Sequence, residues 1–173
     1  HNTVVVDRTR QSMQVVGIPK HFDKTELVKL MDIEAPLVYP QTNMYRRTTA
    51  MIKVNDEHSY IVDFFHVKGG NEHHFSFHSN EAVVTTEGLN LVKQPTGTYA
   101  GQDVHFKQKP EDDSMPGAKY TGPGFHYLYN VEKDNNPSNI FSVDWQQVKD
   151  MDVHLRLTMI GDVESVALVD GDP

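Results

Sequence analysis

One stretch, Tyr60 to His78, constrains the fold of this 173-residue chain more than any other. Its first arm is rich in β-branched and aromatic residues, which suit a pleated, half-buried surface. The segment Lys68-Gly69-Gly70-Asn71 follows, and its two glycines can adopt the positive φ angles that a tight turn needs. The second arm alternates, with Phe75 and Phe77 on one face and His74, Ser76 and His78 on the other. The stretch therefore predicts a β-hairpin.

Five acidic and histidine side chains crowd the part of this stretch near the turn: Asp63, His66, Glu72, His73 and His74. They are either a polar sheet face with hydrogen-bonded imidazoles or a metal or sugar site. Adjacent His73 and His74 point to opposite faces, and His74 lies about 13 Å along a strand from His78. Neither pair can therefore hold one ion without help from another strand. His66 and His73 flank the turn and could approach each other across it.

The remaining chain consists of short strand-like runs separated by turn residues. We predict strands near residues 1–7, 13–16, 29–35, 46–54, 82–91, 125–131, 140–148, 151–160 and 164–169, with residues 46–78 as a three-stranded meander. A long loop rich in Gly and Pro, with a brief strand at Val104–Phe106, is expected over residues 94–124. About ten or more short strands predict an all-β fold, an antiparallel β-sandwich forming a single domain over residues 1–173.

Composition excludes several classes of partner. The net charge is −8, so nucleic acid is an unsuitable partner, because phosphate binding needs a basic face. No apolar run approaches the roughly 20 residues that span a bilayer, and no signal peptide is visible. The chain has no cysteine, which excludes disulfides and thiolate metal sites.

Residue chemistry alone gives no catalytic set. The chain has no nucleophile elbow, no phosphate-binding glycine loop and no His-Glu-x-x-His motif. The candidates for substrate binding are Arg46, Arg47 and Trp145, the last as a platform on which a sugar could stack. Solvated arginines and core packing of Trp145 are the simpler interpretations.

Two parts of the chain resemble heparinase II/III-like polysaccharide lyases, a family that includes alginate and heparin lyases. His1-Asn2-Thr3-Val4-Val5-Val6-Asp7 is similar to the family's His-Asn-Thr-x-x-x-Asp stretch. The segment Tyr60-Ile61-Val62-Asp63-x-Phe65-x-Val67-x-Gly69-Gly70, with His73 and His78 after it, resembles the family's Gly-Gly segment. Tyr39-Pro40 and Arg47-Thr48 also fall at family positions, and more loosely so does the strand Leu155-Arg156-Leu157. His66 stands where the family often has Arg.

The resemblance implies a C-terminal β-sandwich region of an enzyme whose catalytic part is an N-terminal toroid of helices. Such enzymes cleave uronic-acid-containing polysaccharides by β-elimination and act in the periplasm or outside the cell. The family's metal site, with zinc or another divalent ion, implies a ligand role for His1. The catalytic residues and the other two ligands would lie in the toroid, so we expect this chain alone to be inactive. Its implied partners are an acidic polysaccharide and the toroid of the same protein.

Two other functions remain open. An N-terminal His1 could chelate copper through its amino group and its ring, as in lytic polysaccharide monooxygenases. The chain could instead be a non-catalytic carbohydrate-binding or structural β-sandwich that uses Trp145 and nearby tyrosines.

Overall fold

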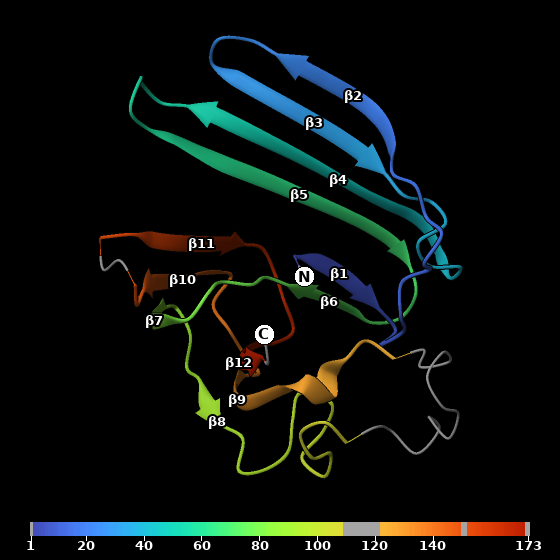
Figure 1. Ribbon diagram of the computed structural model, residues 1–173, viewed down its shortest axis with the longest axis vertical. Helices are drawn as coiled ribbons and strands as arrows, with labels where there is room; N and C mark the ends of the chain where they lie inside the picture. The colour runs from blue at the N-terminus through green and yellow to red at the C-terminus, as the bar shows by residue number, and fades with distance from the viewer. Residues whose placement is uncertain (1, 109–121, 150–151, 172–173) are drawn as a thin grey trace. The chain divides into compact units, whose positions relative to one another are not determined.

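The computed structural model describes residues 2–108, 122–149 and 152–171, and the strands among them all pair in antiparallel fashion (Figure 1). The described strands are β1 (Thr3–Val6), β2 (Ile18–Lys24), β3 (Val28–Glu34), β4 (Thr42–Lys53), β5 (Ser59–Gly69), β6 (His73–Ser76), β7 (Ala82–Glu87), β8 (Val92–Lys93), β9 (Leu128–Asp134), β10 (Ile140–Gln147), β11 (His154–Ile160) and β12 (Val166–Gly171). One short 3-10 helix, Phe125–Tyr127, precedes β9, and the described residues contain no α-helix. The predicted all-β, antiparallel class with ten or more strands is confirmed.

The chain divides into two compact units, His1–Phe77 with Thr121–Pro123, and His78–Tyr120 with Gly124–Pro173. The first unit contains a four-stranded sheet in the order β2-β3-β4-β5 and a two-stranded sheet of β1 and β6 (Figure 1). The second contains two three-stranded sheets in the orders β11-β10-β7 and β12-β9-β8. The single domain expected over residues 1–173 stays a prediction, since two such units can belong to one domain.

The core of the first unit lies where β1 and β6 cover one end of the four-stranded sheet. Its buried residues are Val4, Val6, Val38, Tyr39 and Tyr45, with Phe65, Val67 and Phe75 packed against them. Tyr45 and Phe65 meet edge to face with ring centroids 5.0 Å apart, a favoured geometry for aromatic pairs. The alternation of side chains along a strand explains why Tyr45, Phe65 and Val67 share the face that borders the core. In the β4–β5 register Tyr45 pairs with Val67, and Arg47, two residues further along β4, pairs with Phe65.

The predicted β5–β6 hairpin is wrong. Gly69 and Gly70 do turn the chain, with φ angles of 96° and 78°. After the turn, however, β6 pairs with β1, with Val4 opposite Phe75 and Val6 opposite His73. Among the described strands β5 pairs with β4 alone, so residues 46–78 form no three-stranded meander. The turn residues specify a reversal of direction, but the partner of the second arm is decided by β1, far away in sequence.

Several predicted strands have different boundaries. Residues 13–16 are a turn followed by irregular chain, and the strand begins instead at Ile18 and includes Pro19. This is tolerated because β2 is at the edge of its sheet, where Pro needs no second hydrogen-bonding partner. The predicted strand at Val104–Phe106 is absent, and Phe125–Tyr127 forms the 3-10 helix in place of the start of a strand.

The second unit buries Phe125, Val131, Phe141 and Val143. The predicted alternation in β11 is confirmed by its register with β10, in which Leu155 and Leu157 lie opposite Trp145 and Val143. Arg156 and His154 occupy the other face of the same strand, opposite Asp144 and Gln146. The part of the 94–124 loop that the structure describes contains one isolated bridge, between Thr98 and Gly101.

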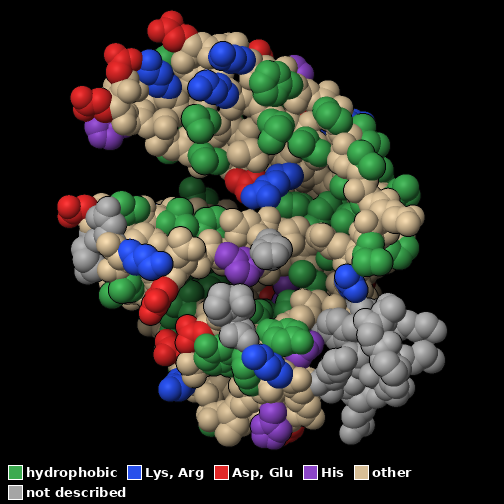
Figure 2. Space-filling view, viewed as in Figure 1, with side chains coloured by type: hydrophobic (Ala, Val, Ile, Leu, Met, Phe, Trp, Pro, Cys, Tyr) green, Lys and Arg blue, Asp and Glu red, His purple; other side chains and the backbone are tan. Residues whose placement is uncertain are grey.

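Both faces of the four-stranded sheet carry exposed apolar side chains. Figure 2 shows hydrophobic, Lys and Arg side chains interspersed over this sheet. One face exposes Phe22, Met31, Met51 and Ile61, and the opposite face exposes Tyr60 and Phe64. Within the described residues, no helix is long and apolar enough to cross a membrane.

Candidate functional site

The two stretches that carry the family resemblance lie side by side in the first unit. We call their meeting point the motif junction, formed by Asn2, Asp7, Arg47, Asp63 and Gly70. The β1–β6 pairing brings the His-Asn-Thr strand alongside the strand that follows the Gly-Gly turn, with Thr3 opposite Ser76. Three contacts, described next, hold the junction together.

Asp7 ends the His-Asn-Thr stretch by capping the Gly-Gly turn. Its Oδ1 accepts hydrogen bonds from the backbone N–H groups of Asn71, at 2.7 Å, and Glu72, at 3.0 Å. Its own backbone N–H donates to the carbonyl of Glu72 at 2.9 Å. The two bonds to the carboxylate lower the pKa of Asp7, because they stabilise its charged form. The acid of the first stretch thus fixes the turn of the second.

Gly70 lets β1 approach that turn closely. A Cβ atom at this position would lie 2.4 Å from Cγ1 of Val6, a distance that real atoms do not tolerate. Val6 is fully buried, so it cannot move aside without disturbing the core. The glycine is required both by this contact and by its positive φ.

Arg47 links β4, β5 and the backbone of the N-terminal stretch. Its Nε lies 2.9 Å from Oδ1 of Asp63, and its Nη2 lies 2.6 Å from Oδ2 of the same carboxylate. Its Nη1 donates to the carbonyl of Asn2 at 2.9 Å. The hydrogen bonds to Asp63 raise the pKa of Arg47. The guanidinium therefore anchors the peptide group between Asn2 and Thr3, while His1 itself lies outside the described residues.

The hydroxyl of Tyr45 anchors the next part of the strand. It lies 2.7 Å from Oγ1 of Thr3, donates to the carbonyl of Val4 at 2.7 Å and accepts from the N–H of Val4 at 3.2 Å. Burial raises the pKa of this phenol, so it stays neutral and can donate. Arg47 and Tyr45, two positions apart on β4, together hold residues 2–4 over the sheet.

Arg46 and Arg47 lie on opposite faces of β4, as neighbouring residues of a strand must. Arg46 forms an ion pair with Asp32 on β3 and lies opposite His66 on β5. Both candidate arginines thus have carboxylate partners. Trp145 lies on β10 in the second unit, half-buried, between Leu155 and Val84 on the neighbouring strands. Because the two arginines lie on opposite faces of β4, they do not share one pocket.

The histidines and acids near the predicted hairpin are dispersed. Asp63 bonds to Arg47 on one face of β5, and His66 lies on the other face. Nε2 of His73 lies 2.8 Å from the carbonyl oxygen of Gly69. Glu72 forms an ion pair with Arg8, and its Oε1 lies 2.9 Å from Nε2 of His74. Among the residues that the structure describes, no group of three or more His, Cys, Asp or Glu side chains could hold a metal ion.

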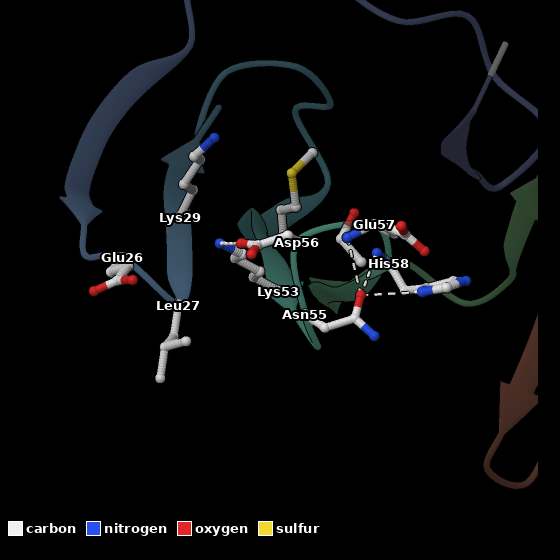
Figure 3. Close-up of a pocket in the computed structure, with 10 residues that line it drawn as sticks. Glu26, Leu27, Lys29, Lys53, Asn55, Asp56, Glu57 and His58 are labelled. Atoms are coloured by element: carbon white, nitrogen blue, oxygen red, sulfur yellow. Dashed lines mark hydrogen bonds and ion pairs between the residues drawn. The ribbon is translucent and has the colours of Figure 1, made fainter.

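A shallow pocket lies at the far end of the four-stranded sheet (Figure 3). It is lined by Glu26, Leu27, Lys29, Met51, Lys53, Asn55, Asp56, Glu57, His58 and Ser59. Its polar groups serve the turn between β4 and β5: Oδ1 of Asn55 accepts from the backbone N–H groups of Glu57 and His58 at 2.9 and 2.8 Å. Lys53 pairs with Asp56 at 2.5 Å. These groups satisfy one another and stabilise the turn.

Sequence reasoning did not identify Asp7, Asp32, Asp63 and Tyr45 as residues that position others. Asp63 and Asp7 do belong to the two resembling stretches, so the resemblance contained the signal. The contact between Arg47 and Asp63 is diagonal, because Arg47 lies opposite Phe65 and Asp63 opposite Thr49, and its detection requires the strand register. Chemically, the described residues of the motif junction position backbone groups, and the carboxylates of Asp7 and Asp63 are engaged in these contacts.

Comparisons with known proteins add no relative. A scan against protein-family models gave no match, and searches of curated proteins and of solved structures gave none either.

Proposed function

We propose that this chain is the β-region of a polysaccharide lyase that cleaves uronic-acid-containing glycans by β-elimination. In this role it supports a catalytic toroid in the same protein and supplies one ligand, His1, to a zinc or other divalent metal site. The observation that carries the proposal is the motif junction. The stretches that resemble the family are far apart in sequence, and Asp7, Gly70 and Arg47 tie them together.

The reaction itself places clear demands on the enzyme. A neutralised uronate carboxylate makes the proton on C5 acidic, a base removes that proton, and the bond from C4 to the leaving oxygen breaks as a C4–C5 double bond forms. An acid then protonates the leaving oxygen. The base and the acid are assigned to the toroid. The part assigned to this chain is to hold the backbone at Asn2, the residue after His1, through Arg47 and the carbonyl of Asn2.

The proposal also implies a location and an activity pattern. The intact protein acts on an acidic polysaccharide in the periplasm or outside the cell, and the isolated chain is inactive. The test compares the isolated chain with the protein that also contains the toroid, on alginate and heparin. The readout is the ultraviolet absorbance of the unsaturated uronic acid product. Absence of product from the toroid-containing protein, or product from the isolated chain, contradicts the proposal.

A matched pair of variants tests the role of the motif junction. In the toroid-containing protein, Arg47→Gln is expected to lower metal content and turnover, because the backbone at Asn2 loses its anchor. Arg156→Gln serves as the control, since Arg156 also pairs with an acidic side chain, Glu87, but on β11 in the other unit. Equal metal content and turnover in the two variants would remove the junction from the mechanism.

A further inference from the structure

One face of β5 carries a row of side chains suited to a sugar chain. Alternate residues of a strand share a face, so Tyr60, Val62, Phe64, His66 and Lys68 lie in a line on the face opposite Asp63. We call this line the β5 row. The side chains of Tyr60 and Phe64 are 52 % and 54 % exposed. The row spans about 26 Å, and its two exposed aromatic rings are about 13 Å apart along the strand.

The row lies at an edge that a long ligand can reach. β5 is the last strand of the four-stranded sheet, and β4 is its only sheet partner among the described residues. Each of the two exposed rings, Tyr60 and Phe64, offers a flat apolar area. Such rings stack against the C–H faces of pyranose sugars. The phenyl group of Phe64 also meets the imidazole of His66 edge to face, with ring centroids 6.5 Å apart.

Arg46 supplies an oriented cation beside the row. On the neighbouring strand β4, Arg46 lies opposite His66, and the next residue on the same face, Thr48, lies opposite Phe64. Its Nε donates to Oδ1 of Asp32 at 2.8 Å, and its Nη2 bonds to the second oxygen of that carboxylate. Asp32 is only 4 % exposed, so the carboxylate holds the guanidinium from below. Nη1 is outside this fork, and the side chain of Arg46 remains 38 % exposed.

The accessible charges at this end of the sheet favour an anionic ligand. Lys68 lies on the same face, is exposed, and its side chain makes no hydrogen bond or ion pair within the described residues. Asp32 is buried under Arg46, and the neighbouring Glu34 pairs with Lys20 at 2.9 Å. In a chain whose net charge is −8, the β5 row therefore ends in exposed positive groups. A guanidinium binds carboxylates through paired hydrogen bonds, and a lysine binds them as a point charge.

We propose that the β5 row binds an acidic polysaccharide laid along the strand. Tyr60 and Phe64 stack on sugar rings, His66 bonds to hydroxyl groups, and Arg46 and Lys68 pair with uronate carboxylates. The assignment rests on the proposed function for its ligand class, and it adds a glycan-holding surface that keeps the polymer on the protein between cleavage events.

The experiment measures binding of short oligosaccharides to the isolated chain by calorimetry. The probes are alginate-derived and heparin-derived oligosaccharides, with a neutral cello-oligosaccharide for comparison. The acidic probes are expected to bind about tenfold more tightly than the neutral one, and added salt is expected to weaken them. No binding of either acidic probe, or equal binding of the neutral one, overturns the proposal.

Two matched comparisons locate the site. The double variant Tyr60→Ala/Phe64→Ala is expected to lose about tenfold in affinity, whereas Ile61→Ala, an exposed apolar residue on the opposite face of β5, is expected to bind normally. Lys68→Gln is expected to weaken only the acidic probes, with Lys29→Gln on the opposite face of the sheet as control. Equal losses in variant and control overturn the assignment. Circular dichroism verifies that each variant is folded.

This experiment can fail separately from the lyase assay. Binding by the isolated chain without product from the toroid-containing protein retains the β5 row and rejects the lyase. Product without binding by the isolated chain rejects the β5 row and retains the lyase.

Discussion

Gly70 occupies a position that other residues cannot share. Its φ of 78° is costly for a residue with a side chain, and a Cβ would lie 2.4 Å from Cγ1 of the buried Val6. We predict that Gly70→Ala lowers the free energy of unfolding by at least about 1–3 kcal/mol, because the backbone at position 70 becomes strained and Val6 is displaced. Urea denaturation measures the change.

The control for this prediction is Gly171→Ala. At Gly171 an added Cβ would meet Cδ2 of Leu128 at 3.6 Å, an ordinary van der Waals distance. If Gly70→Ala lowered the free energy of unfolding no more than Gly171→Ala does, the close approach of β1 to Gly70 would not contribute to stability.

Asp7 makes the stability of the first unit depend on pH. Its pKa is lowered below its usual range by the backbone N–H groups of Asn71 and Glu72, so the folded state binds this proton less readily than the unfolded state. The stabilisation is therefore fully present above the unfolded pKa and is lost as the pH falls through the folded pKa. We predict that wild type exceeds Asp7→Asn in stability near neutral pH and that the difference shrinks in acid.

Denaturation at a series of pH values measures this difference. Asp162→Asn, at an exposed position in the other unit, is the control for removing a surface carboxylate. A difference between wild type and Asp7→Asn that stays constant as the pH falls would rule out the cap.

At the scale of elements, the hydroxyl of Tyr45 joins the two sheets of the first unit. It bonds to both backbone groups of Val4, and Val4 is only 5 % exposed. We predict that Tyr45→Phe lowers the free energy of unfolding by about 1–3 kcal/mol, since buried backbone groups lose a partner. Chemical denaturation measures the loss. Tyr60→Phe removes a hydroxyl from a half-exposed ring and is expected to change stability little.

Alternation was sufficient to predict many strands but not their partners. The register of β10 with β11 agrees with the period of two read from the sequence, and β3 and β4 lie where their β-branched runs indicate. The Gly69-Gly70 turn indicated a reversal of the chain, yet local sequence cannot say that β6 pairs with β1. That choice depends on the core contacts of Val4, Val6 and Phe75, which are non-local.

The candidate site was predictable only in part, for the same reason. The sequence identified Arg46 and Arg47 as cations, and strand geometry places them on opposite faces. Their partners, Asp32 and Asp63, lie on different neighbouring strands. Only the assembled sheet shows that Arg47 holds the N-terminal stretch and that Arg46 lies beside the β5 row.

At the scale of the whole molecule, the only tryptophan of the chain reports on one unit. Trp145 lies on β10 beside Val143, which is 2 % exposed. We predict that Val143→Ala lowers the unfolding midpoint followed by Trp145 fluorescence, with a loss of about 2 kcal/mol from removed contacts and the resulting cavity.

The comparison is with Tyr45→Phe, whose change lies in the other unit. It is expected to shift the midpoint followed by circular dichroism more than the midpoint followed by Trp145 fluorescence. Equal shifts in both signals would show that the two units unfold in one cooperative transition.

The pairing of β1 with β6 also has a kinetic consequence. During synthesis β1 is made before β6 and has no sheet partner until Ser76 has been made, whereas β3, β4 and β5 each pair with a sequence neighbour. Closing the longer loop costs more entropy, and non-local pairings form slowly. We therefore expect the four-stranded meander to form first and the His-Asn-Thr strand to dock last, so that the backbone at Asn2 is fixed only when the rest of its unit has folded.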